Sequence, residues 1–286
     1  MKTAWLEFLP LNPCRRLLWR TGRALYMKAR KESSKAIDVN GEKMMQHALI
    51  SQFMHEQQKL VVFDVGANVG EWALSLMDEA AKLGASDKIE LHCFEPIEST
   101  FQTLEKRLVA HRDRGLITLR NLALSSDEGS STMFFLGENR GTNSLHPEPS
   151  CGDAQPVTVA KTTADLYSRE AKVDTIHYLK VDTEGHDFAV ISGCETLIKE
   201  GRVLVLQFEY NHRWVYSRHF LKDVFDHAMG TAYAVGKITA SGVEIYEKWH
   251  PELERFFEAN YLLIRRDVLG RFPHRILTLD ASNTFA

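Results

Sequence analysis

The sequence has no uninterrupted apolar segment of membrane-spanning length, few prolines and glycines, and no pair of cysteines in CxxC spacing. A helix needs about 20 apolar residues to cross a bilayer, so no membrane-spanning helix is expected. The 8 prolines and 17 glycines among 286 residues follow no period, which excludes a fibrous repeat. The basic N-terminus also lacks a continuous apolar stretch, so we do not expect a secretory signal.

The chain has neither a strong excess of one charge nor a cysteine framework. Its 35 basic and 38 acidic residues give a formal net charge of −3, which does not indicate a dedicated nucleic-acid-binding protein. The hydrophobic fraction of 44% is too high for a disordered chain. We expect the four cysteines, Cys14, Cys93, Cys151 and Cys194, to be reduced thiols, which favours a cytoplasmic location.

The basic charge is concentrated at the N-terminus. Residues 1–31 contain eight basic residues and a single acid, Glu7, and apolar residues recur there at helical spacing. This pattern fits a helix that contacts a membrane surface or a partner, and also a helix that packs on the main domain or on a second subunit. We divide the chain into a helical N-terminal extension, residues 1–55, and a main domain, residues 56–286.

Short apolar strands alternate with helices over most of the main domain. The expected strands are residues 59–65, 89–94, 116–124, 131–136, 157–162, 176–181, 203–208, 231–238, 243–246 and 261–265. The expected helices are residues 72–84, 99–111 with Ser99 as N-cap, 163–171, 187–200, 217–229 and 251–258. This alternation predicts a doubly wound α/β sheet, in which ligands bind beyond the carboxyl ends of the strands.

The residues after the first two strands indicate a nucleoside site. The segment Asp64-Val-Gly-Ala-Asn68-Val-Gly70 holds two glycines, which allow a tight turn and a close approach to a ligand. Asn68 stands where a dinucleotide fingerprint has its second glycine, and the Asp64 carboxylate would repel a pyrophosphate. Glu95, at the end of the second strand, can accept hydrogen bonds from both hydroxyls of a ribose. A nucleoside that carries an amino acid therefore fits best.

Five segments of the main domain form an ordered set of motifs. They are Asp-Val-Gly-Ala-Asn-Val-Gly (64–70), Phe-Glu-Pro (94–96), Asn-Leu-Ala-Leu-Ser (121–125), Leu-Lys-Val-Asp-Thr-Glu-Gly-His-Asp (179–187) and Gln-Phe-Glu-Tyr-Asn (207–211). In this order and spacing they resemble the FkbM family of class I S-adenosylmethionine-dependent O-methyltransferases. The resemblance implies a Rossmann-like seven-stranded sheet with helices on both faces, and S-adenosylmethionine as the cofactor.

The resemblance also implies roles for the residues near the strand ends. The residues expected to contact the cofactor are Asp64, Gly66, Ala67, Asn68, Gly70, Glu95, Pro96, Ala123 and Leu124. Methyl transfer to an alcohol needs a positioned hydroxyl and a group that accepts its proton. The candidates for this catalytic step are Asp182, Glu184, His186 and Glu209.

The acceptor is expected to lie near a loop over residues 137–155 and near the end of the fifth strand. The residues expected to contact it are Asn143, Ser144, Asn211 and His212. Two acids with an amide oxygen, Asp182, Glu209 and Asn211, also form a possible hard-cation site. A substrate-binding carboxylate pair is preferred, and we assign no metal.

The predicted reaction is O-methylation of an aliphatic hydroxyl, preferably of a sugar in a polysaccharide, glycolipid or glycosylated metabolite. A polyketide or macrolide hydroxyl is the alternative, which a more apolar pocket would favour. A nicotinamide-dependent oxidoreductase fits less well, because Asn68 replaces the middle glycine. A non-catalytic binding module also fits less well, because Asp182, Glu184 and His186 are all present. The expected partner is a small-molecule or glycan acceptor, and no nucleic acid is expected.

Overall fold

The computed structural model describes residues 13–32, 36–111, 115–135, 144–146 and 155–285. Its strands are β1 (Leu60–Val65), β2 (Ile89–Phe94), β3 (Leu116–Arg120), β4 (Ala123–Leu124), β5 (Gly129–Phe135), β6 (Gln155–Thr162), β7 (Ile176–Val181), β8 (Val203–Tyr210), β9 (Tyr233–Thr239), β10 (Gly242–Tyr246), β11 (Ala259–Arg265) and β12 (His274–Leu277). Its α-helices are α1 (Pro13–Ala29), α2 (Glu42–Phe53), α3 (Glu71–Lys82), α4 (Glu98–Leu108), α5 (Ala164–Glu170), α6 (Asp187–Ser192), α7 (Glu195–Lys199), α8 (Trp214–Ser217) and α9 (Leu221–Ala228).

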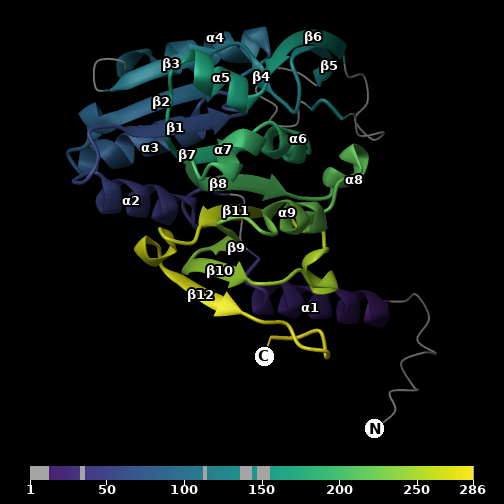
Figure 1. The fold of residues 1–286 in the computed structure, drawn as a ribbon. Helices are drawn as coiled ribbons and strands as arrows, with labels where there is room; N and C mark the ends of the chain where they lie inside the picture. Colours follow the sequence, from purple (N-terminus) through teal and green to yellow (C-terminus); the bar gives the residue numbers. More distant parts are fainter. Residues whose placement is uncertain (1–12, 33–35, 112–114, 136–143, 147–154, 286) are drawn as a thin grey trace.

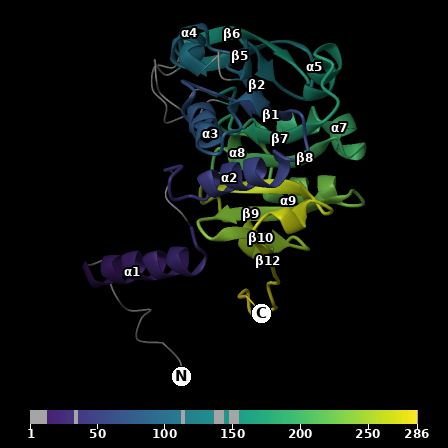
Figure 2. The ribbon, with the colours of Figure 1, turned by 90° about the vertical axis from the view of Figure 1, so that its left-hand side faces the viewer.

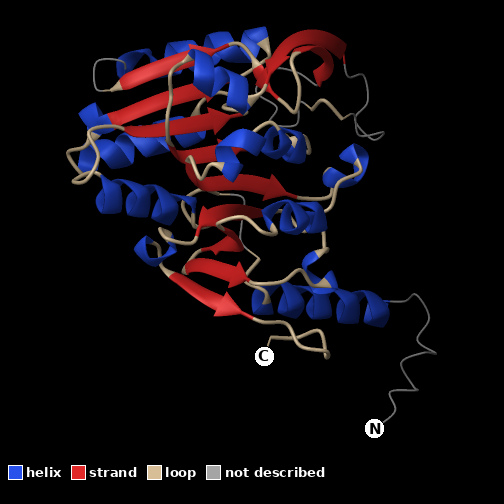
Figure 3. Ribbon diagram, in the orientation of Figure 1, coloured by secondary structure: helices blue, strands red, loops and turns tan. Residues whose placement is uncertain are grey.

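The centre of the molecule is a large sheet with strand order β12-β10-β9-β11-β8-β7-β1-β2-β3 (Figures 1 and 3). Strands β3, β2, β1, β7 and β8 pair in parallel, so their carboxyl ends meet at one edge. Strand β11 lies antiparallel between β8 and β9. A second sheet of order β4-β6-β5 is formed by the chain after β3.

Helices cover both faces of the large sheet because successive strand residues point to opposite sides. In β1, Val62 belongs to a core that includes residues of α2, α3 and α4, whereas Phe63 belongs to a core with α5, α6, α7 and α9. Met45, Leu49 and Ile50 of α2 are among the buried residues of the first core. The second half of the predicted N-terminal extension therefore packs directly on the sheet.

The predicted α/β fold with helices on both faces is confirmed, but the large sheet has nine strands where seven were expected. Strands β3, β2, β1, β7, β8, β11 and β9 form a continuous seven-stranded block, and β10 and β12 extend its edge. The extension arises because β9 returns through a two-residue hairpin loop as β10, on which β12 then pairs. Within the described ranges, no helix has the length and apolar character needed to cross a membrane.

The chain after β2 differs from the prediction at two boundaries. The expected strand 116–124 is divided into β3 and β4, because the side-chain amide of Asn121 donates to the backbone oxygens of Glu95 and Pro96. Helix α4 begins at Glu98 and does not have Ser99 as its N-cap. The Glu95 carboxylate already binds a backbone amide at this helix start, so a serine cap is not needed.

Three expected helices are shorter than predicted. The helix expected over 187–200 is divided into α6 and α7 at Gly193, where a Cβ atom would lie 2.0 Å from the backbone oxygen of Ser125. The helix expected over 217–229 begins only at Leu221, as α9, because α8 ends at Ser217 and Arg218 follows it with a left-handed φ of 61°. The segment 251–258 contains a single 3-10 turn, Pro251–Leu253.

Candidate active site

The turn after β1 joins the ends of three strands. Gly66 has a φ of +76°, and a Cβ atom there would lie 2.0 Å from the backbone oxygen of Asp182, so only glycine fits. The amides of Gly66 and Ala67 both donate to the backbone oxygen of Phe94 at 3.0 Å. The Asp182 amide donates to the backbone oxygen of Val65 at 3.0 Å. The turn therefore fixes the ends of β1, β2 and β7 against one another.

Glu95 presents a buried carboxylate at the same edge. Its Oε2 accepts a hydrogen bond from the Asn68 amide at 3.0 Å, and its Oε1 accepts one from the Ile97 amide at 2.9 Å. Burial raises the pKa of Glu95 to about 7, although these two amides oppose the shift. Each carboxylate oxygen retains a second lone pair, so the group can still accept hydroxyl hydrogen bonds.

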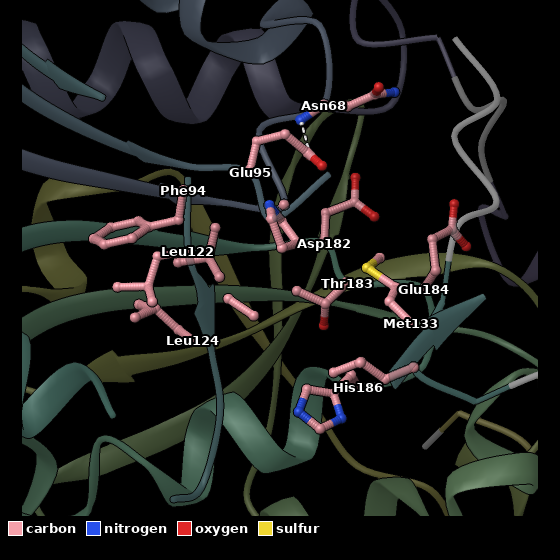
Figure 4. A pocket seen from close by; sticks show the side chains of 15 residues that line it. Asn68, Phe94, Glu95, Leu122, Leu124, Met133, Asp182, Thr183, Glu184 and His186 are labelled. Atoms are coloured by element: carbon pink, nitrogen blue, oxygen red, sulfur yellow. Dashed lines mark hydrogen bonds between the residues drawn. The ribbon is translucent and has the colours of Figure 1, made fainter. Parts of the chain in front are cut away.

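A cavity of about 170 Å³ lies beside this turn, and we call it the cofactor cavity (Figure 4). Its lining is apolar apart from three acids, one histidine, one asparagine and one threonine, and consists of Val65, Gly66, Asn68, Phe94, Glu95, Pro96, Leu122, Ala123, Leu124, Met133, Leu145, Asp182, Thr183, Glu184 and His186. Apolar walls next to the Glu95 carboxylate suit a nucleoside, whose base is flat and whose ribose donates hydrogen bonds. The Thr183 hydroxyl is buried without a hydrogen-bond partner among the described residues, so it is available to a ligand.

The structure brings most of the predicted cofactor-binding residues together. Six of them line the cofactor cavity, namely Gly66, Asn68, Glu95, Pro96, Ala123 and Leu124. Asp64 and Ala67 are buried and absent from its lining. Gly70 is the N-cap residue of α3, with a left-handed φ of 86°, and shapes the turn through its backbone.

Lys180 is a part of this site that the sequence analysis missed. Its Nζ lies 3.3 Å from Oδ1 of Asp64 and 3.4 Å from Oδ2 of Asp182, and its side chain is 6% exposed. Burial alone lowers the pKa of Lys180, but the carboxylates of Asp64, Asp182 and Glu42 outweigh burial and raise it. The position of this lysine inside an apolar strand could have indicated its role, because a buried ammonium group needs acidic partners.

Asp182 lines the cofactor cavity and also a second cavity of about 420 Å³, which we call the acceptor cavity. The acceptor cavity is rich in acids and aromatic rings, and its lining consists of Arg23, Met27, Glu32, Asn40, Glu42, Asp182, Glu209, His212, Phe256, Phe257, Glu258, Ala259 and Asn260. The Asp182 side chain is 39% exposed and lines both cavities. Parallel pairing of Val181 with Phe208 places Glu209 beside Asp182.

The other two catalytic candidates in this turn have close protein partners. His186 has Nε2 at 3.0 Å from the Ser125 hydroxyl and Nδ1 at 3.1 Å from Nε2 of His146. Burial, with a smaller effect of His146, lowers the pKa of His186 to about 3, so its ring is neutral at ordinary pH. The Glu184 carboxylate forms an ion pair with Arg213. Both residues line the cofactor cavity, and neither lines the acceptor cavity.

The predicted acceptor-binding residues are placed in different environments. The Ser144 hydroxyl donates to the backbone oxygen of Glu184 at 2.7 Å, and His212 lines the acceptor cavity. Asn211 is fully buried, and its amide donates to the Glu209 carboxylate at 2.6 Å. Asn143 and most of the 137–155 loop lie outside the described residues. In the described part of the chain, no group of three or more His, Cys, Asp or Glu side chains is arranged to hold a metal ion.

Comparison with known proteins identifies the family to which this chain belongs. The methyltransferase FkbM domain matches residues 64–238, which is more than half of the chain. The protein therefore belongs to the FkbM methyltransferase family, and its methyl donor is S-adenosylmethionine. The predicted family and cofactor are confirmed.

The individual proteins that resemble this chain have low sequence identity to it. The chain is 24% identical over 170 residues to the hexuronic acid methyltransferase AglP of Haloferax volcanii, a match that covers 59% of this chain and 63% of AglP. The chain thus matches less than two thirds of the length of this relative. Similar solved structures include the magnesium protoporphyrin IX methyltransferase ChlM of Synechocystis PCC 6803, with 11% identity, a TM-score of 0.39 and coverage of 79% of this chain and 80% of that chain. Fibrillarin of Aeropyrum pernix has 11% identity and a TM-score of 0.39, and covers 79% and 76% of the two chains.

Proposed function

We propose that the protein transfers a methyl group from S-adenosylmethionine to an aliphatic hydroxyl of a sugar. The observation that carries this proposal is the position of Asp182 between the cofactor cavity and the acceptor cavity. Glu95 would hold the ribose hydroxyls of the cofactor, and the apolar residues Phe94 and Leu124 would contact its base. When bound, the cofactor supplies an activated methyl group for displacement.

Asp182 is the proposed proton acceptor for the attacking hydroxyl. An alcohol is a weak nucleophile unless a neighbouring group removes its proton during the attack. The Lys180 ammonium lies 3.4 Å from the Asp182 carboxylate and holds it in place, and the 39% exposure of Asp182 leaves it accessible to a substrate. His186 is less suited to this role because its lowered pKa makes it a weak base, and Glu184 because Arg213 neutralises it.

The lining of the acceptor cavity favours a sugar over an apolar acceptor. Carboxyl groups such as that of Glu209 and the amide of Asn260 can bind several hydroxyl groups, while Phe256 and Phe257 supply apolar ring faces. The similarity to a hexuronic acid methyltransferase supports the same substrate class. A polyketide or macrolide hydroxyl remains the alternative acceptor, and we expect it to fit less well in this polar cavity.

The N-terminal residues have a place in this proposal. Asn40 and Glu42 line the acceptor cavity together with residues of the main domain. We therefore propose that residues 1–55 form an extension that completes the acceptor site of a methyltransferase domain over residues 56–286. The buried free thiols of Cys93 and Cys194 support a reducing location such as the cytoplasm.

The test combines cofactor binding with methyl transfer. Isothermal titration should detect S-adenosylmethionine binding, and radiolabelled cofactor should methylate hexoses or hexuronic acids in a glycoside panel. The Asp182→Asn variant should lose about 10²- to 10⁴-fold in kcat and retain cofactor affinity within about threefold. Asp78→Asn on the exposed face of α3 is the matched control and should keep full activity. Absence of cofactor binding, or full activity of Asp182→Asn, would refute the proposal.

A further inference from the structure

Helix α1 exposes large apolar side chains that nothing in the described chain covers. None of its residues is buried, and Leu17, Leu18, Trp19 and Leu25 are 67%, 52%, 74% and 64% exposed. Figure 2 shows the helix beside the body of the molecule, with its N-terminal end pointing away from the sheet. A 17-residue helix is marginal in water on its own, so this surface calls for a partner.

The charge of α1 indicates the chemistry of that partner. The helix has five basic residues and no acidic residue. Arg16, Arg20 and Arg23 recur at i, i+4 and i+7 and share one face, whereas Leu18 and Leu25 are seven residues apart and share another. A basic amphipathic helix with Trp and Leu side chains is the pattern that binds in the plane of an anionic membrane surface.

The C-terminal end of α1 is attached to the body next to the acceptor cavity. The Tyr26 hydroxyl donates to the Glu252 carboxylate at 2.8 Å, and the Arg23 guanidinium lies 4.6 Å from the centre of the Phe257 ring. Arg23 and Met27 also line the acceptor cavity. Any surface that α1 binds is therefore brought close to the acceptor cavity.

We propose that α1 docks the protein on an anionic lipid bilayer and brings the acceptor cavity to the membrane surface. The role of this docking in catalysis rests on the proposed function, because it requires an acceptor sugar that is attached to a membrane lipid. The charge of α1 is complementary to anionic headgroups, and the exposed Leu18 and Leu25 can enter the interface. A second copy of the chain is the competing occupant, and the experiment below separates the two.

The experiment measures partition of the full chain onto extruded vesicles by co-sedimentation. We expect binding to vesicles of equimolar phosphatidylcholine and phosphatidylglycerol, little binding to phosphatidylcholine alone, and release by added salt. Arg16→Gln with Arg20→Gln should weaken partition at least about tenfold. Leu18→Ser with Leu25→Ser should weaken it by a similar factor, because apolar burial is lost. The matched control Lys106→Gln with Lys248→Gln removes two exposed charges from the body and should leave partition unchanged.

Two results would overturn the inference. One is equal partition of wild type and both α1 variants, or no partition of any of them. The other is a wild-type protein that is a dimer in sedimentation velocity and a Leu18→Ser, Leu25→Ser variant that is a monomer with unchanged vesicle binding. That result would assign the apolar face of α1 to a second copy of the chain. Titration of the same samples with S-adenosylmethionine tests the proposed function separately. If the protein does not bind the cofactor, the proposed function fails, but the measured binding to vesicles still tests the docking of α1.

Discussion

The ammonium nitrogen of Lys180 lies 3.4 Å from Oδ2 of Asp182, so the proposed proton acceptor is held by a buried cation two residues earlier in the chain. The same nitrogen lies 3.3 Å from Oδ1 of Asp64, which is itself fully buried. Water does not screen the ion pair of Lys180 with Asp64 effectively at this depth, whereas the Asp182 side chain is 39% exposed. Lys180 thus connects the buried Asp64 of β1 to Asp182, which lines both cavities.

Replacement of Lys180 by Met should slow methyl transfer. Loss of the cation removes the ion pair that holds the Asp182 carboxylate, which lines both cavities. We expect kcat to fall by about 10- to 100-fold, because the proposed proton acceptor is no longer held in position. The measurement is kcat and KM of methyl transfer for wild type, Lys180→Met and the charge-preserving Lys180→Arg.

The Lys180 variants also carry a stability expectation. Lys180→Met leaves Asp64 buried without a counter-charge, so the free energy of unfolding should fall by about 3 to 5 kcal/mol. Lys180→Arg keeps the charge and should lose less of kcat than Lys180→Met. A folded Lys180→Met protein with the kcat of wild type would show that Lys180 has a purely structural role.

Two glycines with similar backbone angles should respond differently to alanine. Gly66 has a φ of +76°, and its added Cβ atom would meet the Asp182 backbone, whereas Gly84 has a φ of +65° and open space around it. We expect Gly66→Ala to lower the free energy of unfolding by about 3 to 5 kcal/mol, from clash and strain together, and to weaken cofactor binding. Gly84→Ala carries only the strain, about 1 kcal/mol. Denaturant unfolding of both variants measures the difference, and equal losses would contradict it.

The features that sequence could predict are those that depend on neighbouring residues. The Gly66 turn and Glu95 follow directly after apolar strands, and in a parallel sheet such positions share one edge. The break at Asn121 could not be predicted, because it depends on the contact of its side chain with the backbone of Glu95 and Pro96. Local periodicity contains no information about such a contact.

The polar network behind the site was also beyond the sequence. Gln207 of β8 donates to the Glu42 carboxylate at 2.6 Å, and Glu42 in turn raises the pKa of Lys180. These residues come from distant parts of the chain and meet only after α2 packs on the sheet. The motifs therefore indicated Asp182 and Glu209 as candidates, but not the cation that distinguishes Asp182 from the other acids.

Cofactor affinity should depend on the ionisation of Glu95. Burial raises the pKa of Glu95 to about 7. Because the ribose hydroxyls donate hydrogen bonds to the ionised carboxylate, cofactor binding below this pH requires deprotonation of Glu95. Affinity should thus be full above pH 8 and fall about tenfold by pH 6. Titration calorimetry with S-adenosylmethionine measures this slope. The Glu95→Gln variant should bind the cofactor more weakly, and its affinity should lack this dependence on pH. An identical pH dependence of affinity in that variant would argue against Glu95 as the ribose ligand.

Glu209 offers a test of which carboxyl group accepts the proton. Burial, followed by repulsion from Asp182 and other acids, raises the pKa of Glu209 well above its ordinary value, which favours its protonated form. A protonated carboxyl donates a hydrogen bond much as an amide does. We therefore expect Glu209→Gln to keep kcat within about threefold of wild type, while Asp182→Asn loses about 10²- to 10⁴-fold. The reverse order in single-turnover methyl transfer would move the proton-accepting role to Glu209.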